Sequence, residues 1–210
     1  MSRTLPTRWG LKPPKKLGEL TGPFDIARCT PFALDRLIET DFAEFAQPQN
    51  LQYRPDVDYC DDPYIEFEFV HENGHAYVEN DFAQLRSTYD ARIEQFREML
   101  KDPRPTMLVL SYPHIFGAHP SAIEALVRTF ERIQARREAP TAMYCFRSLS
   151  PGQVPEIADF QRTEFEWLNV ERPSDEYGWW LAEHFLTDRG TMYEQRIVSG
   201  IAKMVERLRW

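Results

Sequence analysis

Apolar residues in the second half of the chain alternate between short runs and helical stripes. Three runs, at residues 106–111, 141–146 and 165–170, have the length and bounds of buried strands. Between them, His119-Pro120-Ser121 opens a predicted helix to about Arg137. After them, residues 191–208 place apolar side chains on one helical face, which predicts a final helix. This order favours an α/β fold with a mainly parallel sheet flanked by helices.

The first half of the chain predicts two more helices and two loop regions. Residues 32–45 and a segment from Asn80 or Asp81 to about Leu100 carry helical stripes. Residues 1–31 are rich in Pro and Gly and predict a loop, and residues 46–63 predict a polar loop. No internal repeat or composition shift marks a boundary, so we predict a single α/β domain over residues 1–210.

A β-hairpin is predicted near residues 64–79. Residues 64–69 alternate with a period of two, and Asn73-Gly74 is a strong signal for a two-residue turn. In that register, Glu72 would pair with His75, and His71 would end an apolar row facing the core. His71 is then either a core histidine bonded to a backbone carbonyl, or a general acid or base at the rim of a sheet.

The same stretch contains H-E-x-x-H at residues 71–75, the spacing of zinc metalloproteases. In those enzymes the motif lies on a helix, which places both imidazoles on one face. A turn at Asn73-Gly74 would instead point the two histidines to opposite sides. We therefore predict no zinc site here, and the sequence indicates no metal or other cofactor.

Composition narrows the classes of function. The chain has 210 residues, 42% of them hydrophobic, a formal net charge of -8 and a pI near 5.2. Such an acidic chain disfavours nucleic acid as a partner, and no apolar run approaches the roughly 18 residues of a membrane span. Three widely spaced cysteines and no apolar leader favour a reduced, cytoplasmic compartment. The expected partner is a small molecule or a peptide.

Polar residues follow each predicted strand of the second half. In open α/β sheets, ligands bind beyond the carboxyl ends of the strands, where His114, Arg147 and Arg172 would line one crevice. The alternative is that the three are ordinary loop residues. No G-x-G-x-x-G, G-x-x-x-x-G-K-[ST] or G-x-S-x-G occurs, which removes the usual sequence support for a nucleotide loop or a hydrolase elbow.

The three cysteines differ as candidate nucleophiles. Cys145 lies in a buried strand pattern, and Cys60 is surrounded by acidic residues that would disfavour its thiolate. Cys29 precedes a predicted helix, whose dipole would lower the pKa of its thiol. It is the best candidate of the three.

The stretch "TRWGLKPPKKLGELTGPFD" (residues 7–25) and the later segments "LIETDFAEF", "FVHE" and "NDFAQLRSTYDARIEQF" resemble a bacterial family of unknown function described as papain-like cysteine peptidases. The resemblance covers most of residues 2–147. Its most specific motif is G-P-F-D at Gly22 to Asp25, followed by F-x-H-[DE] at Phe69 to Glu72. It implies an α/β fold, with His71 and Asp25 at motif positions of the family.

One departure from the family affects the expected chemistry. Family members begin with a strand resembling S-L-G-x-x-C, whose cysteine is the natural nucleophile, ahead of the position where this chain has Ser2. This chain begins at Met1 without that strand. We therefore expect either a start further upstream or a protein that has lost the nucleophile.

Three hypotheses of function follow. The first is cysteine-dependent acyl hydrolysis or transfer, with His71 as general base, oriented by Asp25 or Glu72, and a nucleophile upstream of Met1 or at Cys29. The second is a non-catalytic binding or accessory module that holds an anionic small molecule or glycan phosphate between Arg147 and Arg172. The third is a transferase that acts on precursors of polysaccharides.

Overall fold

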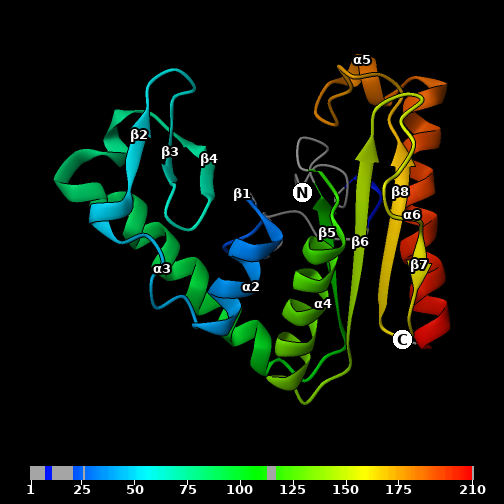
Figure 1. Ribbon diagram of the computed structural model, residues 1–210, viewed down its shortest axis with the longest axis horizontal. Coiled ribbons are helices and arrows are strands. Elements are labelled where there is room, and N and C mark those ends of the chain that lie inside the picture. The colour runs from blue at the N-terminus through cyan, green and yellow to red at the C-terminus, as the bar shows by residue number, and fades with distance from the viewer. Residues whose placement is uncertain (1–7, 11–20, 26, 113–116, 210) are drawn as a thin grey trace. The chain divides into compact units, whose positions relative to one another are not determined.

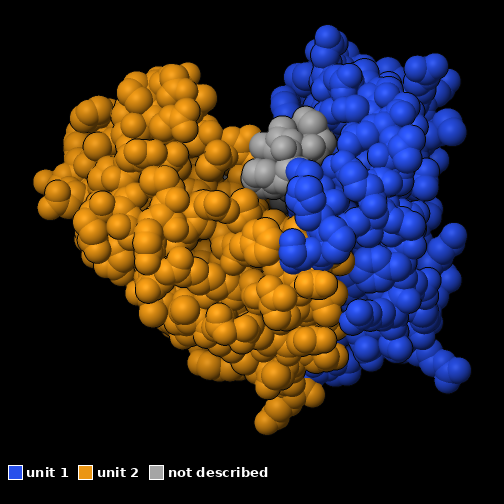
Figure 2. Space-filling model, in the orientation of Figure 1, with its two compact units in different colours: residues 1–14, 103–121, 139–210 blue, residues 15–102, 122–138 orange. Residues whose placement is uncertain are grey.

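The computed structural model (Figure 1) describes residues 8–10, 21–25, 27–112 and 117–209. The chain divides into two compact units (Figure 2): unit 1 is residues 1–14, 103–121 and 139–210, and unit 2 is residues 15–102 and 122–138. Each unit has its own four-stranded sheet. The predicted α/β class is confirmed, while the single domain over 1–210 stays a prediction.

Unit 1 contains the predicted parallel strands. β5 (Thr106–Tyr112), β6 (Thr141–Leu149) and β8 (Phe165–Glu171) pair in parallel, and the short β7 (Phe160–Gln161) adds antiparallel to β8. β6 lies between two strands and is buried along all 9 residues, whereas the edge strand β5 is mostly half-buried. The three apolar runs of the sequence are therefore confirmed as strands.

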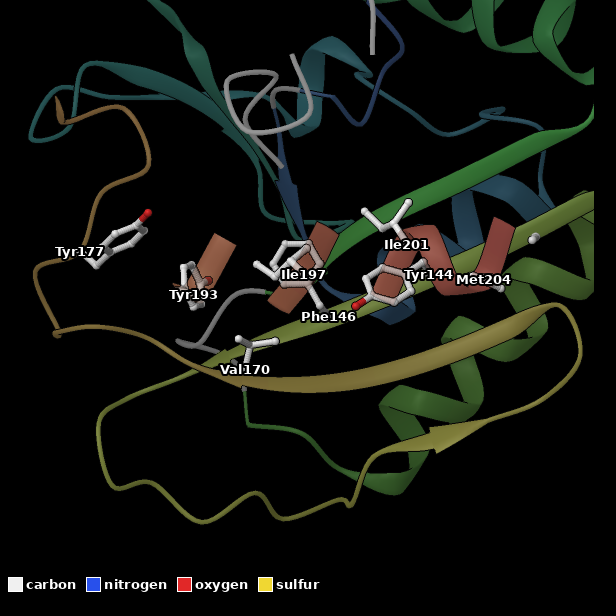
Figure 3. Close-up of a cluster of buried hydrophobic side chains, with 9 residues drawn as sticks. Tyr144, Phe146, Val170, Tyr177, Tyr193, Ile197, Ile201 and Met204 are labelled. Atoms are coloured by element: carbon white, nitrogen blue, oxygen red, sulfur yellow. The ribbon is translucent and has the colours of Figure 1, made fainter. Parts of the chain in front are cut away.

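Helix α6 (Asp188–Leu208), preceded by the short α5 (Ala182–Phe185), packs on one face of β6 and β8. The Thr187 side chain accepts a hydrogen bond from the Gly190 amide and so caps α6. Figure 3 shows the resulting core, which runs along α6 from Tyr177 and Tyr193 to Met204. At Gly200 the helix comes so close to the sheet that an added Cβ would lie 2.1 Å from the Tyr144 hydroxyl.

Unit 2 contains an antiparallel sheet in the order β1-β4-β3-β2. Its strands are β1 (Arg28–Cys29), β2 (Gln52–Arg54), β3 (Tyr59–Asp62) and β4 (Phe67–Asn73). The unit also contains helices α2 (Pro31–Glu39) and α3 (Glu79–Lys101), most of α4 (Pro120–Ala135) and the 3-10 turns η2 (Pro48–Asn50) and η3 (His75–Tyr77). The segments predicted as loops, 1–31 and 46–63, thus contribute three of the four strands.

The predicted hairpin over residues 64–79 is wrong in its second strand and in its turn. β4 pairs with β3, and the chain reverses at residues 63–66, where Glu66 has φ 57°. Gly74 does take a positive φ of 95°, but it leads into η3 and then α3. The chain does turn at Gly74, but the strand that pairs with β4 is β3, which precedes it in the sequence.

Residues with left-handed backbone conformation follow the end of α2 and occupy the start of α3. Asp41 and Phe42 have φ of 50° and 64°, so α2 ends at Glu39, six residues short of the predicted end at 45. Asn80, Asp81 and Phe82 are also left-handed, and regular helix begins only after them. Asn and Asp tolerate this conformation better than most residues, which explains why the predicted cap became a tight turn.

Aromatic side chains form the core of unit 2. Phe24 stacks on Phe42 with ring centroids 5.7 Å apart and meets the edge of Phe96 at 5.9 Å. Phe67 and Phe69 of β4 pack edge-on against Tyr89 of α3. The predicted stripe of α3 is confirmed, since its buried residues are Leu85, Tyr89, Ile93, Phe96 and Leu100.

A buried carboxylate in unit 2 predicts an unusual dependence of stability on pH. Asp62 is fully buried, and burial raises the pKa of its carboxyl to about 6, against smaller lowering by the amides of Ile65, Tyr64 and Ala46. A carboxyl with a raised folded pKa stabilises the fold below its unfolded pKa, and this contribution is lost as pH rises through about 6. We expect Asp62→Asn to increase the free energy of unfolding by about 1–3 kcal/mol at pH 7.5 and by much less at pH 4.

Urea unfolding at the two pH values measures this difference. Asp56→Asn is the matched control, because Asp56 is exposed and its ion pair with Arg54 lies at the surface. An equal change in the free energy of unfolding for Asp62→Asn at both pH values would contradict the assignment.

The close approach of α6 to β6 makes a second prediction. Gly200→Ala should lower the free energy of unfolding by roughly 1–3 kcal/mol, because the Tyr144 ring is fully buried and has no room to move. Tyr144→Phe alone should be nearly neutral, since the hydroxyl bonds no group within the described ranges. In thermal or urea unfolding, the double variant should recover part of the loss. Strict additivity of the two changes would show that the clash is not at Tyr144.

Candidate functional site

His71 and Glu72, two of the predicted catalytic residues, point to opposite sides of β4. Glu72 is buried and accepts hydrogen bonds from the Tyr89 hydroxyl at 3.1 Å and from Arg92 at 2.7 Å. His71 is exposed and does not lie in the core row as predicted. The reason is a register shift between Tyr59 and Cys60, which breaks the alternation of β4 after Phe69. Glu72 therefore does not orient His71.

Cys29 does not form a pair with His71. Cys29 lies opposite Phe67, and His71 follows four residues later, roughly 13 Å further along the strand. Cys29 is half-buried, and burial raises the pKa of its thiol to about 12. The predicted lowering by the helix dipole is thus wrong, and the thiol lacks the reach and the ionisation that a nucleophile needs.

The other two cysteines are core residues. Burial raises the pKa of the Cys60 thiol to about 11, and the carboxylates of Asp61, Glu72 and Asp58 add to the effect. Cys145 is fully buried in β6, and burial raises its pKa as well. Cys145 thus lies in the core as predicted, and the carboxylates near Cys60 raise the pKa of its thiol as predicted.

The G-P-F-D motif has a structural role in unit 2. The Asp25 carboxylate accepts a hydrogen bond from the Gly22 amide at 2.8 Å, and the Asp25 amide donates back to the Gly22 carbonyl. The reciprocal bonds close a turn that presents Phe24 to the aromatic core. Asp25 thus holds the turn.

The H-E-x-x-H segment is not helical. Residues 71–73 belong to β4, Gly74 follows, and His75 begins η3. On an α-helix, two histidines four residues apart lie on the same face, and His71 and His75 do not share one α-helix here. Across the described ranges, no three His, Cys, Asp or Glu residues cluster in a way that would hold a metal ion.

Arg147 is the charged residue that the parallel sheet of unit 1 buries most deeply. Its side chain is 1% exposed and forms an ion pair with Glu156, which is 49% exposed. One guanidinium nitrogen donates to each carboxylate oxygen of Glu156, the second at 3.4 Å. This two-pronged contact holds the pKa of the Glu156 carboxyl below its ordinary value.

The neighbours of Arg147 come from the carboxyl ends of the adjacent strands. Tyr112 of β5 and Asn169 of β8 lie beside it in register. Asn169 binds the loop that carries Glu156, through the Ile157 carbonyl at 2.9 Å and the Asp159 carboxylate at 2.7 Å. A buried guanidinium therefore faces a carboxylate on a tethered surface loop.

Arg147 and Arg172, two of the three predicted binding residues, have separate partners. Arg147 alternates with Phe146 and Ser148, whose side chains pack on or bond to the α6 side, so Arg147 lies on the other face. Arg172 lies near Tyr193 of α6 and binds Asp175 and the Ser150 hydroxyl at 3.0 and 3.2 Å. His114 lies outside the described residues.

Sequence reasoning missed the partner of Arg147. A charged residue at the end of an apolar run was the signal that identified Arg147. Glu156 had no such signal, because it lies in a loop whose exposed polar residues follow no period. At neutral pH a guanidinium stays charged and transfers no proton, so the Arg147 site is suited to binding an anion and not to acid–base chemistry.

Comparison of the chain with protein-family models, with curated proteins and with solved structures finds no match. The resemblance to papain-like cysteine peptidases thus stays a prediction. Of the helices that the structure describes, none has the length and apolar character needed to cross a bilayer.

The raised thiol pKa values predict slow alkylation of the folded protein. At pH 8, a thiol with a pKa of about 12 or about 11 is ionised at least roughly a hundredfold less than a free cysteine. Iodoacetamide should therefore modify Cys29 and Cys60 at least roughly a hundredfold more slowly in the native protein than in urea. Peptide mass spectrometry after timed quenching measures each rate. Rapid modification of native Cys29 would restore it as a candidate nucleophile.

Proposed function

We propose that the protein is a non-catalytic binding module that holds an anionic group of a small molecule against Arg147. The observation that carries the proposal is the pairing of a guanidinium that is 1% exposed with a carboxylate that is half-exposed. A buried charged side chain usually pairs with another buried group, because a charge that is removed from water and left unpaired is strongly destabilising. Here Glu156, one partner of the guanidinium, comes from the surface, where a ligand anion can replace it.

The position of Arg147 supports the same function. It lies near the carboxyl ends of parallel strands, where α/β sheets bind their ligands. Its fork of nitrogens matches a carboxylate or a phosphate, and Glu156 already occupies it in the manner of a bound carboxylate. The pKa shifts of the three cysteines give no comparable support to cysteine-dependent acyl chemistry.

Two opposite substitutions test this proposal. Glu156→Gln removes the competing charge, so isothermal titration with glucose 1-phosphate and with inorganic phosphate should show binding at least about tenfold tighter than in the wild type. Arg147→Gln should reduce binding of the same anions at least about tenfold. All titrations are made at one ionic strength, because anion binding is sensitive to salt.

Glu176→Gln is the matched control, since Glu176 is exposed and its substitution changes the net charge equally. If Glu156→Gln binds anions no better than Glu176→Gln does, Glu156 does not occupy a ligand position. Unchanged binding by Arg147→Gln would remove Arg147 from the site.

A further inference from the structure

A second buried charge in unit 1 lies at the other face of the sheet, on α6. Glu194 is 1% exposed, and its carboxylate receives three hydrogen bonds. The donors are Arg8, the indole of Trp9 at 2.6 Å and the Tyr177 hydroxyl at 3.0 Å. Two of these donors come from a short segment some 185 residues away along the chain.

Arg8 is held on three sides. One nitrogen pairs with Glu194, and another donates to the Trp179 carbonyl. The guanidinium carbon lies 3.3 Å from the centre of the Phe185 ring. A carboxylate, a carbonyl and an aromatic face are the three groups that recognise arginine in preference to lysine, because only arginine offers a planar fork that also stacks.

The residues that hold Arg8 come from one short stretch of unit 1. Glu194, Tyr177, Trp179 and Phe185, which we call the Glu194 site, all come from residues 177–194 of unit 1. Tyr177 belongs to the core of that unit, and Trp179 and Phe185 pack against it, as Trp9 also does. Figure 3 shows Tyr177 at the end of that core. Arg8 itself is 22% exposed, so the site opens to solvent where the arginine enters.

A pocket of about 300 Å³ adjoins the Glu194 site, and Tyr177 belongs to both. The pocket is also lined by His184, which stacks on Tyr177 with ring centroids 6.0 Å apart, and by the acidic residues Glu183 and Asp188. Arg189 lines the pocket as well, so a peptide whose arginine entered the Glu194 site would find room there for a neighbouring side chain, beside both acidic and basic groups.

We infer that the Glu194 site recognises an arginine followed by an aromatic residue in a peptide, and that the chain's own Arg8-Trp9 occupies it until such a peptide displaces it. The site is distinct from Arg147, since α6 and Arg147 lie on opposite faces of the sheet. Because Arg8-Trp9 is part of the same chain, it competes for the site at an effective concentration in roughly the millimolar range. A peptide must overcome this competition in order to bind.

The experiment uses the full chain and the dipeptide N-acetyl-Arg-Trp-amide. Isothermal titration should show that Arg8→Ala/Trp9→Ala binds this probe at least tenfold more tightly than the wild type does, because its own occupant is gone. The matched probe N-acetyl-Lys-Trp-amide should bind the variant at least tenfold more weakly. Adding Glu194→Gln should abolish the preference for arginine.

The double substitution removes two hydrogen-bond donors from the buried Glu194 carboxylate and could prevent folding. A second variant controls for this outcome. Arg8→Lys keeps a cation opposite Glu194 but loses the fork, so it should also bind N-acetyl-Arg-Trp-amide more tightly than the wild type. Equal binding of the arginine and lysine probes would overturn the inference. So would equal affinity of the wild type and both variants for the arginine probe.

Discussion

The complete burial of β6 is the constraint on which unit 1 depends. A strand with a neighbour on each side and both faces covered leaves no polar side chain in water, so each one needs a specific partner. Arg147 finds Glu156, and Ser148 bonds the Tyr193 hydroxyl at 2.5 Å. Tyr144 instead packs under Gly200. The loop over Arg147 and the position of α6 are thus both tied to polar residues of one strand.

The sequence alone predicts those helices and strands whose apolar positions form a regular pattern. The three parallel strands and the buried stripe of α3 follow from apolar periodicity, because burial alone decides them. The antiparallel sheet of unit 2 was largely missed. Its strands β1, β2 and β3 have only 2, 3 and 4 residues, too few to show a period. The exposure of His71 depends on a register shift, which no pattern within β4 reveals.

The candidate site was predictable to a similar extent. Arg147 stands out because a charged residue ends an apolar run, whereas Glu156 and Glu194 are defined by contacts between distant segments. Local signals also misled: Asn73-Gly74 suggested a turn between two strands, and the helix after Cys29 suggested a lowered pKa. In the first case the pairing lay elsewhere, and in the second desolvation by burial raised the pKa of the thiol.

The path of the chain has a consequence for how the protein reaches its native state. β5 and β6 are neighbours in one sheet, yet most of the residues that separate them, 122–138, belong to unit 2. The parallel pairing of β5 with β6 therefore closes a loop most of which belongs to another core, and closing a loop costs conformational entropy before the pairing contacts form. Neither unit is one continuous stretch of the chain, so a truncation that removes one unit also interrupts the other.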